Sequence, residues 1–485
     1  MSPPPPIHVF RSHSYPLHAT AFSANNQLLY AGDEEGWITI TDLKVKRVVA
    51  HWRAHESGVL GVGEWLGGLV SHGRDNIIHF HAPLDPSHSQ PTASDSSLTN
   101  LLQPPQIIRS LPVNSLNFCG FHLIPIPAGY ELQSRHAEGP DDAVLNKLQN
   151  DSADTADSNL TCSNIDGKWF SAQGLLAVPN LTDSETIDIY HLPSFGRLHA
   201  AVGTRTTSAN LQLEGKIRSG LVMSVRMYFT GAAKDAPVTD TNEGKNTLLA
   251  KSDPRHGVPA LRLVAAYEDG RVEQWECKDW QKRSDPRLRA SNNPAKAGGG
   301  GWQTLWTQKG HNEAIMAMAI SPTLDYAYTV SADHLLVRYQ LQTSDSFVNG
   351  VTGGSDLLVK HSTKQIGNSA VAVSPDGRVV AVGGWDGGIR LLSTKTFKSL
   401  GTLSYHRQSC HTISFPHNLA ASCADDLHLG DHSSVLEIDG DDSEDDSDYE
   451  TSDQKATSHN VMRWMVSGAK DRRLALWELK DFSRK

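Results

Sequence analysis

The chain has 485 residues, 38% of them hydrophobic and 20% charged, which is enough apolar material for a large core beneath a solvated surface. Its net charge of −10 comes from residues 424–458, where thirteen Asp or Glu and one Lys give −12, so the remainder carries about +2. Because duplex binding needs clustered Lys and Arg, this nearly neutral body argues against direct nucleic-acid binding.

A membrane or secreted location is also disfavoured. No run of about 18 apolar residues could span a bilayer, and the opening MSPPPP lacks the charged and apolar regions of a signal peptide. The five cysteines are far apart and form no CxxC pair for zinc or redox chemistry. We therefore expect free thiols and a location in the cytosol or nucleus.

A short pattern recurs along the chain: a small or polar pair, a turn residue that is usually Asp, and alternating apolar positions that end in an aromatic. Alternation with period two is typical of strands, so each copy predicts strands joined by a tight turn. In chain order the copies are AGDEEGWITITDL around Glu35, SHGRDNIIHFH around Asp75, TDSETIDIYHL with Ser184 at the acid position, AAYEDGRVEQWE around Asp269, VSADHLLVRYQL around Asp333, GGWDGGIRLLS around Asp386 and SGAKDRRLALWEL around Asp471.

A second signal precedes several of these units: a His followed by a short apolar strand, at His13, His55, His311 and His406. Between the two signals, ISPTLDYAYTV and VSPDGRVVAVGG contain SP and DG steps that favour a compact hairpin turn. Each unit is thus predicted to be a small antiparallel sheet.

These units resemble WD repeats, and seven of them imply an all-β, seven-bladed WD-repeat β-propeller. The resemblance implies a buried polar network in each blade, which ties the inner strand to the tight turn. Its recurrence favours a structural role over catalysis. The residues expected in it are His55, Ser71, Asp75, His311, Ser331, Asp333, Asp386 and Asp471.

Ring closure is predicted from the two chain ends, because an unmatched terminal blade would expose apolar surface. In the WD-repeat family the N-terminal strand completes the last blade, and IHVF at residues 7–10 is suited to that place beside LALWEL at 474–479. Residues 1–485 are then one propeller. Polar, Pro- and Gly-rich insertions predicted to be disordered fall at 83–105, 125–166, 231–257, 279–301 and 424–458.

Two longer segments are similar to the ASTRA-associated protein family of fungal WD-repeat proteins, a relative of the animal G-protein β-subunit-like protein. They are WRAHESGVLGVGEWLGGLVSHGRDNIIHFH at 52–81 and the C-terminal VSGAKDRRLALWELKDF, and the opening PPPPIHVFRSHSYPLHATAF adds to the likeness. The sequence departs from the WD pattern at His81, where an aromatic is usual, and in the degenerate third unit, which leaves blade boundaries open.

This resemblance implies a non-catalytic scaffold subunit of the nuclear ASTRA complex, which is linked to chromatin remodelling and to kinases resembling phosphatidylinositol 3-kinases. Kinase-like and AAA-type ATPase subunits would be its partners, with the nucleus as its place and the cytoplasm as the alternative. A substrate receptor of a ubiquitin ligase is the alternative function. An enzyme with a site in the central channel is a third possibility.

The sequence supplies no motif for catalysis, a cofactor or a metal. It lacks a GxSxG elbow, a Walker loop and an HExxH pair, and GGGG at 298–301 lacks the flanking strand and Lys of a phosphate cradle. His79 and His81 alternate like strand residues. We therefore expect no catalytic residues and no cofactor or metal site.

The residue before each turn acid should project from the rim and is a candidate for partner binding. Trp385 stands out, because Trp is enriched in interface hot spots; packing against a neighbouring blade is the alternative. The candidates are Glu34, Arg74, Glu268, Trp385 and Lys470.

Two charged segments allow more than one interpretation. IDGDDSEDDSDYETSD could bind a basic partner, mimic nucleic acid, or accept phosphate at Ser443, Ser447 or Thr451, and a solvated loop is the simpler interpretation. KRSDPRLR at 282–289 is either an import signal or a charged loop.

Overall fold

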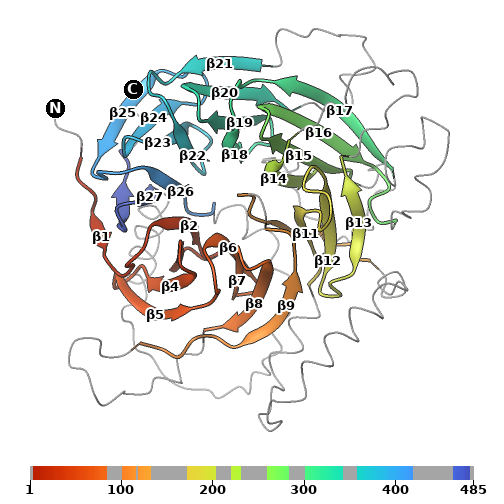
Figure 1. Cartoon of the computed structure of the whole chain (residues 1–485), viewed down its shortest axis with the longest axis horizontal. Helices are drawn as coiled ribbons and strands as arrows, with labels where there is room; N and C mark the ends of the chain where they lie inside the picture. Colours follow the sequence, from red (N-terminus) through yellow and green to blue (C-terminus); the bar gives the residue numbers. More distant parts are fainter. Residues whose placement is uncertain are drawn as a thin grey trace, which may run out of the picture.

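The computed structural model describes residues 4–84, 101–115, 118–132, 172–203, 220–230, 259–282, 301–341, 358–418 and 463–480. Within them the chain forms 28 β-strands in seven four-stranded antiparallel sheets and no helix. The sheets stand around a centre like the blades of a propeller (Figure 1). The predicted seven-bladed all-β propeller is confirmed.

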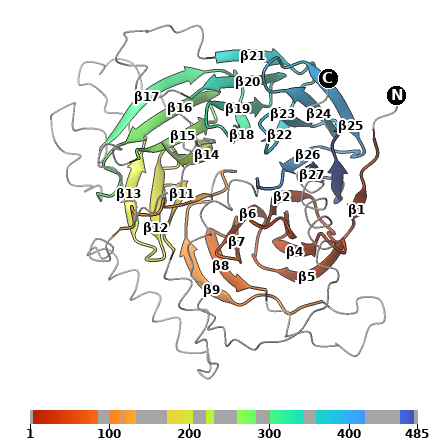
Figure 2. The same cartoon turned by 180° about the vertical axis from the view of Figure 1, so that it is seen from behind.

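In each blade the strands follow one another from the centre outward, and the first strand is innermost (Figures 1 and 2). The first three blades are β2 (Leu17–Phe22), β3 (Leu28–Asp33), β4 (Trp37–Asp42) and β5 (Arg47–Arg53); β6 (Val59–Trp65), β7 (Gly68–Gly73), β8 (Ile77–Pro83) and β9 (Ile107–Pro112); and β10 (His122–Pro125), β11 (Gly174–Pro179), β12 (Ile187–Leu192) and β13 (Arg197–Val202).

The fourth to sixth blades repeat this order. They are β14 (Val222–Phe229), β15 (Leu261–Tyr267), β16 (Arg271–Cys277) and β17 (Trp302–Lys309); β18 (Ile315–Ile320), β19 (Tyr326–Ser331), β20 (Leu335–Gln340) and β21 (Leu358–Ser362); and β22 (Asn368–Val373), β23 (Val379–Gly384), β24 (Gly388–Ser393) and β25 (Ser399–Ser404). The third blade, which has no acid at its turn position in the sequence, is nevertheless a complete sheet.

The seventh blade joins the two ends of the chain. Its order is β26 (Cys410–Ser414), β27 (Trp464–Ala469), β28 (Leu474–Glu478) and then β1 (His8–Phe10) as the outer strand. Val9 faces Ala475 in the antiparallel register, and the Ile7 N–H donates to the Leu476 carbonyl at 2.8 Å. The predicted closure by the N-terminal strand is confirmed.

The hydrophobic core is divided into layers between the blades. Each of seven buried clusters takes residues from two neighbouring sheets, so the layers follow one another around the ring. Leu17 and Leu29 of the first blade, for example, pack with Leu474 and Leu476 of the seventh. No blade buries its apolar faces alone, so its folding depends on both neighbours.

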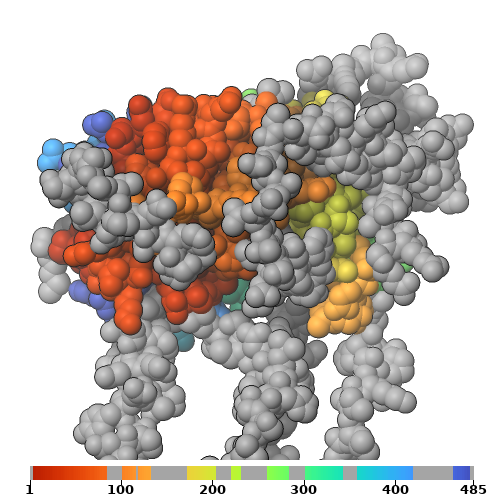
Figure 3. All heavy atoms as spheres, turned by 90° about the horizontal axis from the view of Figure 1, so that it is seen from below, coloured from red at the N-terminus to blue at the C-terminus, as the bar shows by residue number. Residues whose placement is uncertain are grey.

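Strand direction alternates, so the connections separate onto two faces. We call one the turn face: it carries the turns between the second and third strands of the blades and the connections that enter the first strands. Figure 3 shows the described body edge on, with the first two blades toward the viewer. The turns of the turn face are residues 34–36, 74–76, 180–186, 268–270, 332–334, 385–387 and 470–473.

The internal stretches that the structure does not describe fall between strands. Those at 133–171, 231–258 and 419–462 stand in the chain between the first and second strands of a blade, those at 85–100, 283–300 and 342–357 between the third and fourth strands, and those at 116–117 and 204–219 between the fourth strand of one blade and the first strand of the next. The predicted insertions 83–105, 125–166, 231–257, 279–301 and 424–458 therefore lie largely or wholly outside the described residues. Trp280, inside the fourth of these ranges, is fully buried.

Candidate interaction face

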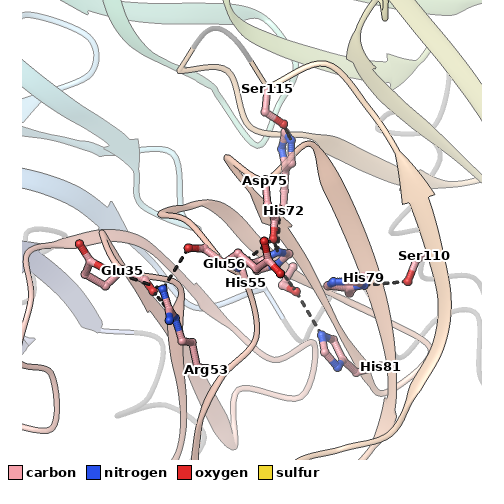
Figure 4. Close-up of polar contacts among 11 residues, drawn as sticks. Glu35, Arg53, His55, Glu56, His72, Asp75, His79, His81, Ser110 and Ser115 are labelled. Carbon is pink, nitrogen blue, oxygen red and sulfur yellow. Dashed lines mark hydrogen bonds and ion pairs between the residues drawn. The ribbon is translucent and has the colours of Figure 1, made fainter.

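A buried hydrogen-bonded triad connects the entry of the second blade to its tight turn (Figure 4). The His55 Nδ1–H donates to both carboxylate oxygens of Asp75 at 3.1 and 3.0 Å, and the Ser71 hydroxyl donates to Nε2 at 2.8 Å. A carboxylate only accepts, which places the proton on Nδ1. Burial pushes the pKa of Asp75 upward, but the hydrogen bonds from His55 and the Glu56 N–H outweigh it and hold that pKa below its ordinary value.

The fifth and seventh blades contain the same triad, with one correction to the sequence prediction. His311 donates to Asp333 at 3.0 Å, but its hydroxyl partner is Thr329 at 2.8 Å. Ser331, predicted for that place, accepts the Asp333 backbone N–H at 3.3 Å instead. In the second, fifth and seventh blades the hydroxyl comes four residues before the acid, as Ser71 does, because that strand position faces the imidazole.

In the seventh blade His406 donates to Asp471 at 3.2 Å and accepts from Ser467 at 2.8 Å. Ser467 in turn accepts the indole N–H of Trp477 at 2.8 Å, which carries the network to the third strand. In the second blade His81 stands six residues after the acid, as Trp477 does, and its Nε2 lies 3.1 Å from the Ser71 hydroxyl. The histidine that departs from the WD pattern thus makes the same contact.

The first blade uses a different acid from the one that the pattern indicated. His13 contacts Asp33 at 2.9 Å and Thr39 at 2.9 Å, whereas Glu35, two residues after Asp33, is exposed near Arg53 at 3.9 Å. The carboxylate comes from the end of the second strand, so the turn position itself is free to vary.

The fourth and sixth blades lack the entry histidine, and an arginine pairs with the turn acid. Asp386 was predicted in the buried histidine network, which is wrong: it is exposed and accepts from Arg390 at 2.7 Å. Asp269 accepts from Arg271 in the same way. Without a histidine at the entry, the acid holds its own turn and the following strand only.

The described residues offer little reactive chemistry. Three buried cysteines, Cys119, Cys277 and Cys410, form no disulfide among the described residues, and burial raises the pKa of each to about 12, far from a reactive thiolate. Among described residues, no three His, Cys, Asp or Glu side chains gather as metal ligands would. Among the described residues there is no helix long and apolar enough to cross a membrane.

The five candidate partner-binding residues occupy equivalent positions on the turn face, and all are exposed. Each donates its backbone N–H to the carbonyl just before the first strand of its own blade, at 2.8 to 3.0 Å. The pairs are Glu34 with Pro16, Arg74 with Gly58, Glu268 with Leu221, Trp385 with Gly367 and Lys470 with Ser409. Since the backbone is used in this way, the side chains are free to vary.

Trp385 is 46% exposed, and a Cβ on Gly367 would lie 2.1 Å from its ring, so the indole rests on the glycine of its own blade entry. Arg74 lies over the Phe118 ring at 4.4 Å from its centroid, and Phe118 is 59% exposed. Both aromatics therefore present open surface on the turn face.

Large exposed apolar side chains are unequally distributed between the faces. Of those among the described residues, Val45 alone is on a turn of the other face, and the rest outside the turn face lie on β9, on β21 or, in the case of Ile7, just before β1. Apolar surface gathered among charged residues is typical of a protein-binding surface. The turn face holds Tyr15, Phe118, Leu181, Ile366 and Trp385.

A cavity of about 470 Å³ lies at the centre of the ring, and all seven blades or their entries contribute to its wall. Trp385 and Phe118 border it, so it opens on the turn face. Among the described residues that line it, Arg226 of β14 is the sole Arg, Lys, Asp or Glu. The sequence analysis did not single out Arg226, although a lone cation within the apolar run LVMSVRMYF was a usable signal.

Two histidines stand at the turn-face end of the same cavity. The rings of His18 and His411 are 4.8 Å apart. Burial lowers the pKa of His18 to about 4, which the neighbouring His411 ring lowers further, and burial also lowers the pKa of His411. At neutral pH both are uncharged, so Arg226 supplies the cavity's formal charge.

Comparison with known proteins agrees with this architecture. The model of the family described as "WD domain, G-beta repeat" matches residues 302–337 and 355–393. Each match begins near the outer strand of one blade and continues through the first three strands of the next. One sequence repeat therefore spans two neighbouring blades.

Full-length relatives extend the resemblance to nearly the whole chain. A protein of Aspergillus flavus named ASTRA-associated protein 1 is 27% identical over 98% of both chains. The protein of that name in Penicillium rubens is 26% identical over 99% of this chain and 98% of its own. The one in Schizosaccharomyces pombe is 24% identical over 85% of this chain and 93% of its own.

This chain is similar over nearly its whole length to the fungal proteins named ASTRA-associated protein 1. The predicted resemblance is confirmed, and it covers the long insertions as well as the blades. The alignments with these relatives cover the sequence of all seven blades, so the similarity is to the complete propeller.

Proposed function

We propose that the chain is a non-catalytic scaffold subunit of the ASTRA complex and binds partner subunits through its turn face. The observation that carries this proposal is the group of exposed apolar side chains on that face, with Trp385 and Phe118 at the mouth of the central cavity. The names of the full-length relatives support the choice of complex.

The partners would be the kinase-like and AAA-type ATPase subunits, and the place of action the nucleus. The role would be in chromatin remodelling and in the assembly of kinases that resemble phosphatidylinositol 3-kinases. A rigid ring suits this role, because its surface is formed before the partner arrives and little ordering entropy is lost on binding. The candidate contact residues remain Glu34, Arg74, Glu268, Trp385 and Lys470.

The test is quantitative affinity purification of the full chain from native extract. Trp385→Ala should lower recovery of the kinase-like and ATPase subunits about tenfold, as expected for loss of a hot-spot aromatic. Its melting temperature should not change, because the half-exposed indole belongs to none of the seven core layers. Val45→Ala, which truncates an exposed side chain on the other face, is the matched control.

Two results would contradict the proposal. A lower melting temperature with unchanged recovery would assign Trp385 to packing. Recovery of a cullin adaptor in place of the expected subunits would indicate a ubiquitin-ligase receptor instead.

A further inference from the structure

Arg226 has an unusual environment for an arginine inside a protein. It is the fifth residue of β14, in the run VMSVRMYF, and it lines the central cavity at partial exposure. Its one hydrogen bond among the described residues runs from Nη1 to the carbonyl of Val225, its own neighbour, at 2.9 Å. Burial lowers the pKa of the guanidinium, so its charge is poorly solvated there.

Two other described arginines with little exposure, by contrast, are paired with acids. Arg262 donates to Glu276 at 2.8 Å, and Arg390 donates to Asp386 at 2.7 Å. No carboxylate is among the described residues that line the cavity around Arg226. A guanidinium in such a place gains most from a carboxylate, which it can hold by two parallel N–H···O bonds.

The surrounding wall indicates the charge and the character of the ligand. Its apolar part includes the partly exposed side chains of Met316 and Phe121, whereas Met223 and Met318 are buried behind the wall. With His18 and His411 uncharged, the cavity offers one positive charge, which matches a single carboxylate better than a doubly charged phosphate.

The depth of Arg226 indicates how the carboxylate arrives. It lies four residue steps along the strand from Val222, where β14 begins at the turn face, and at roughly 3.3 Å per residue this is about 13 Å. One extended chain end of about four residues reaches that far. A loop would need two chain segments side by side, entering and returning. A cavity of about 470 Å³ is in the size range of pockets for small ligands.

We propose that the central cavity receives the C-terminal tail of a partner protein, with its terminal carboxylate on Arg226 and its apolar side chains against Met316 and Phe121. Trp385 and Phe118 would contact the residues of the tail that remain at the mouth. This inference rests on the proposed role of the turn face as the partner-binding surface.

The test uses the full chain and two fluorescein-labelled pools of tetrapeptides with Leu, Met, Phe or Val at each position. One pool has a free C-terminal carboxylate and the other a C-terminal amide, and fluorescence polarisation gives both affinities. The free-acid pool should bind at least about tenfold more tightly, as a charge-assisted bidentate pair requires. Arg226→Gln should remove that preference, and Arg226→Lys should retain part of it.

Arg338→Gln is the matched control, because Arg338 stacks on Tyr326 and donates to the Thr394 carbonyl outside the cavity. It should leave the preference unchanged. Equal affinity for the two pools, or no binding at about 1 mM, would overturn the proposal. Equal binding of a peptide blocked at both ends with an internal Glu would overturn the assignment to a chain end.

Two further outcomes separate this inference from the proposed function. If Trp385→Ala lowers partner recovery while Arg226→Gln changes no peptide affinity, the turn face binds partners but the cavity does not receive a tail. If the free-acid pool binds only after residues 424–458 are deleted, the chain's own acidic segment is the occupant and the partner tail is excluded.

Discussion

The polar side chains that recur in the blades are architectural, and their contacts explain why they recur. His311 makes two hydrogen bonds to Asp333 and one to Thr329, and together they join the blade entry to its tight turn. Removing one buried partner leaves the other unsatisfied, which costs more than the bond itself contributes. Asp386, which has no histidine partner, should therefore contribute much less to the free energy of unfolding.

A matched pair of substitutions tests this difference. Asp333→Asn should lower the free energy of unfolding by about 2–3 kcal/mol, because the carboxylate accepts from the imidazole and from the Leu335 N–H. Asp386→Asn should cost less than about 1 kcal/mol, since its pair with Arg390 is partly exposed. Urea denaturation measures both, and equal losses would contradict the structural role of the histidine.

Several buried histidines of the second blade should make the protein sensitive to acid. Burial lowers the pKa of His72 to about 3 and those of His79 and His81 to about 4. Below about pH 6.5 the unfolded chain binds protons that the folded chain does not, so stability is complete above that pH and falls as the pH falls toward 4. The melting temperature should drop across this window.

His72→Gln should reduce the drop, because glutamine keeps a polar contact to Ser115 but does not titrate. Thermal denaturation of both proteins at about pH 7 and about pH 5 measures it. An identical drop in the variant would show that His72 does not contribute to the acid sensitivity.

At the scale of strands and turns, the sequence pattern predicted the second and third strands well. Alternation of apolar residues marks both, and the turn between them has few possible lengths, so the copies around Asp75 and Asp471 match the observed strands closely. The outer strands were not predictable in this way. The outer strand β21, for example, is LVKHS, with little buried surface to impose a pattern.

The same reasoning explains which site residues were missed. In the first blade Asp33, and not Glu35, binds the entry histidine His13. Both acids satisfy the local sequence pattern, so only the folded geometry distinguishes them. Phe118 and Arg226 come from an entry connection and an inner strand of different blades, and they line one cavity only when the blades are assembled. Contacts between elements distant in the chain are not encoded in local periodicity.

The tight turns impose a steric demand that can be separated from backbone strain. Gly36 and Gly129 have nearly the same left-handed φ, +88° and +86°, but a Cβ on Gly36 would lie 2.1 Å from the His55 carbonyl oxygen, whereas one on Gly129 meets nothing within 4 Å. Gly129→Ala should cost about 1 kcal/mol for strain alone, and Gly36→Ala clearly more. Similar urea midpoints for the two variants would refute the steric contribution.

At the scale of the whole molecule, the ring is a closed structure with no independent blade. The seam between the first and last blades has core packing, the β1–β28 pairing and side-chain bonds such as Thr20 to Thr412 at 2.8 Å. Because each apolar layer belongs to two blades, opening one seam exposes surface on both sides. Folding should therefore be lost as a unit.

Deletion of residues 471–485 removes β28 and should unfold the whole ring, as seen in the loss of the β-sheet circular dichroism signal. Deletion of 481–485 alone removes no strand that the structure describes and serves as the control. A shorter chain that melts at the full-length temperature would refute closure through the last blade.

The orientation of the ring in its assembly is the claim on which the functional account depends. Hydrogen–deuterium exchange of the free chain and of the chain in its purified complex tests it directly. The account predicts new protection on the turn face, at residues 14–17, 74–76, 366–369 and 385–387, and little change at residues 43–46 and 394–398 of the other face. Protection confined to the other face would contradict it.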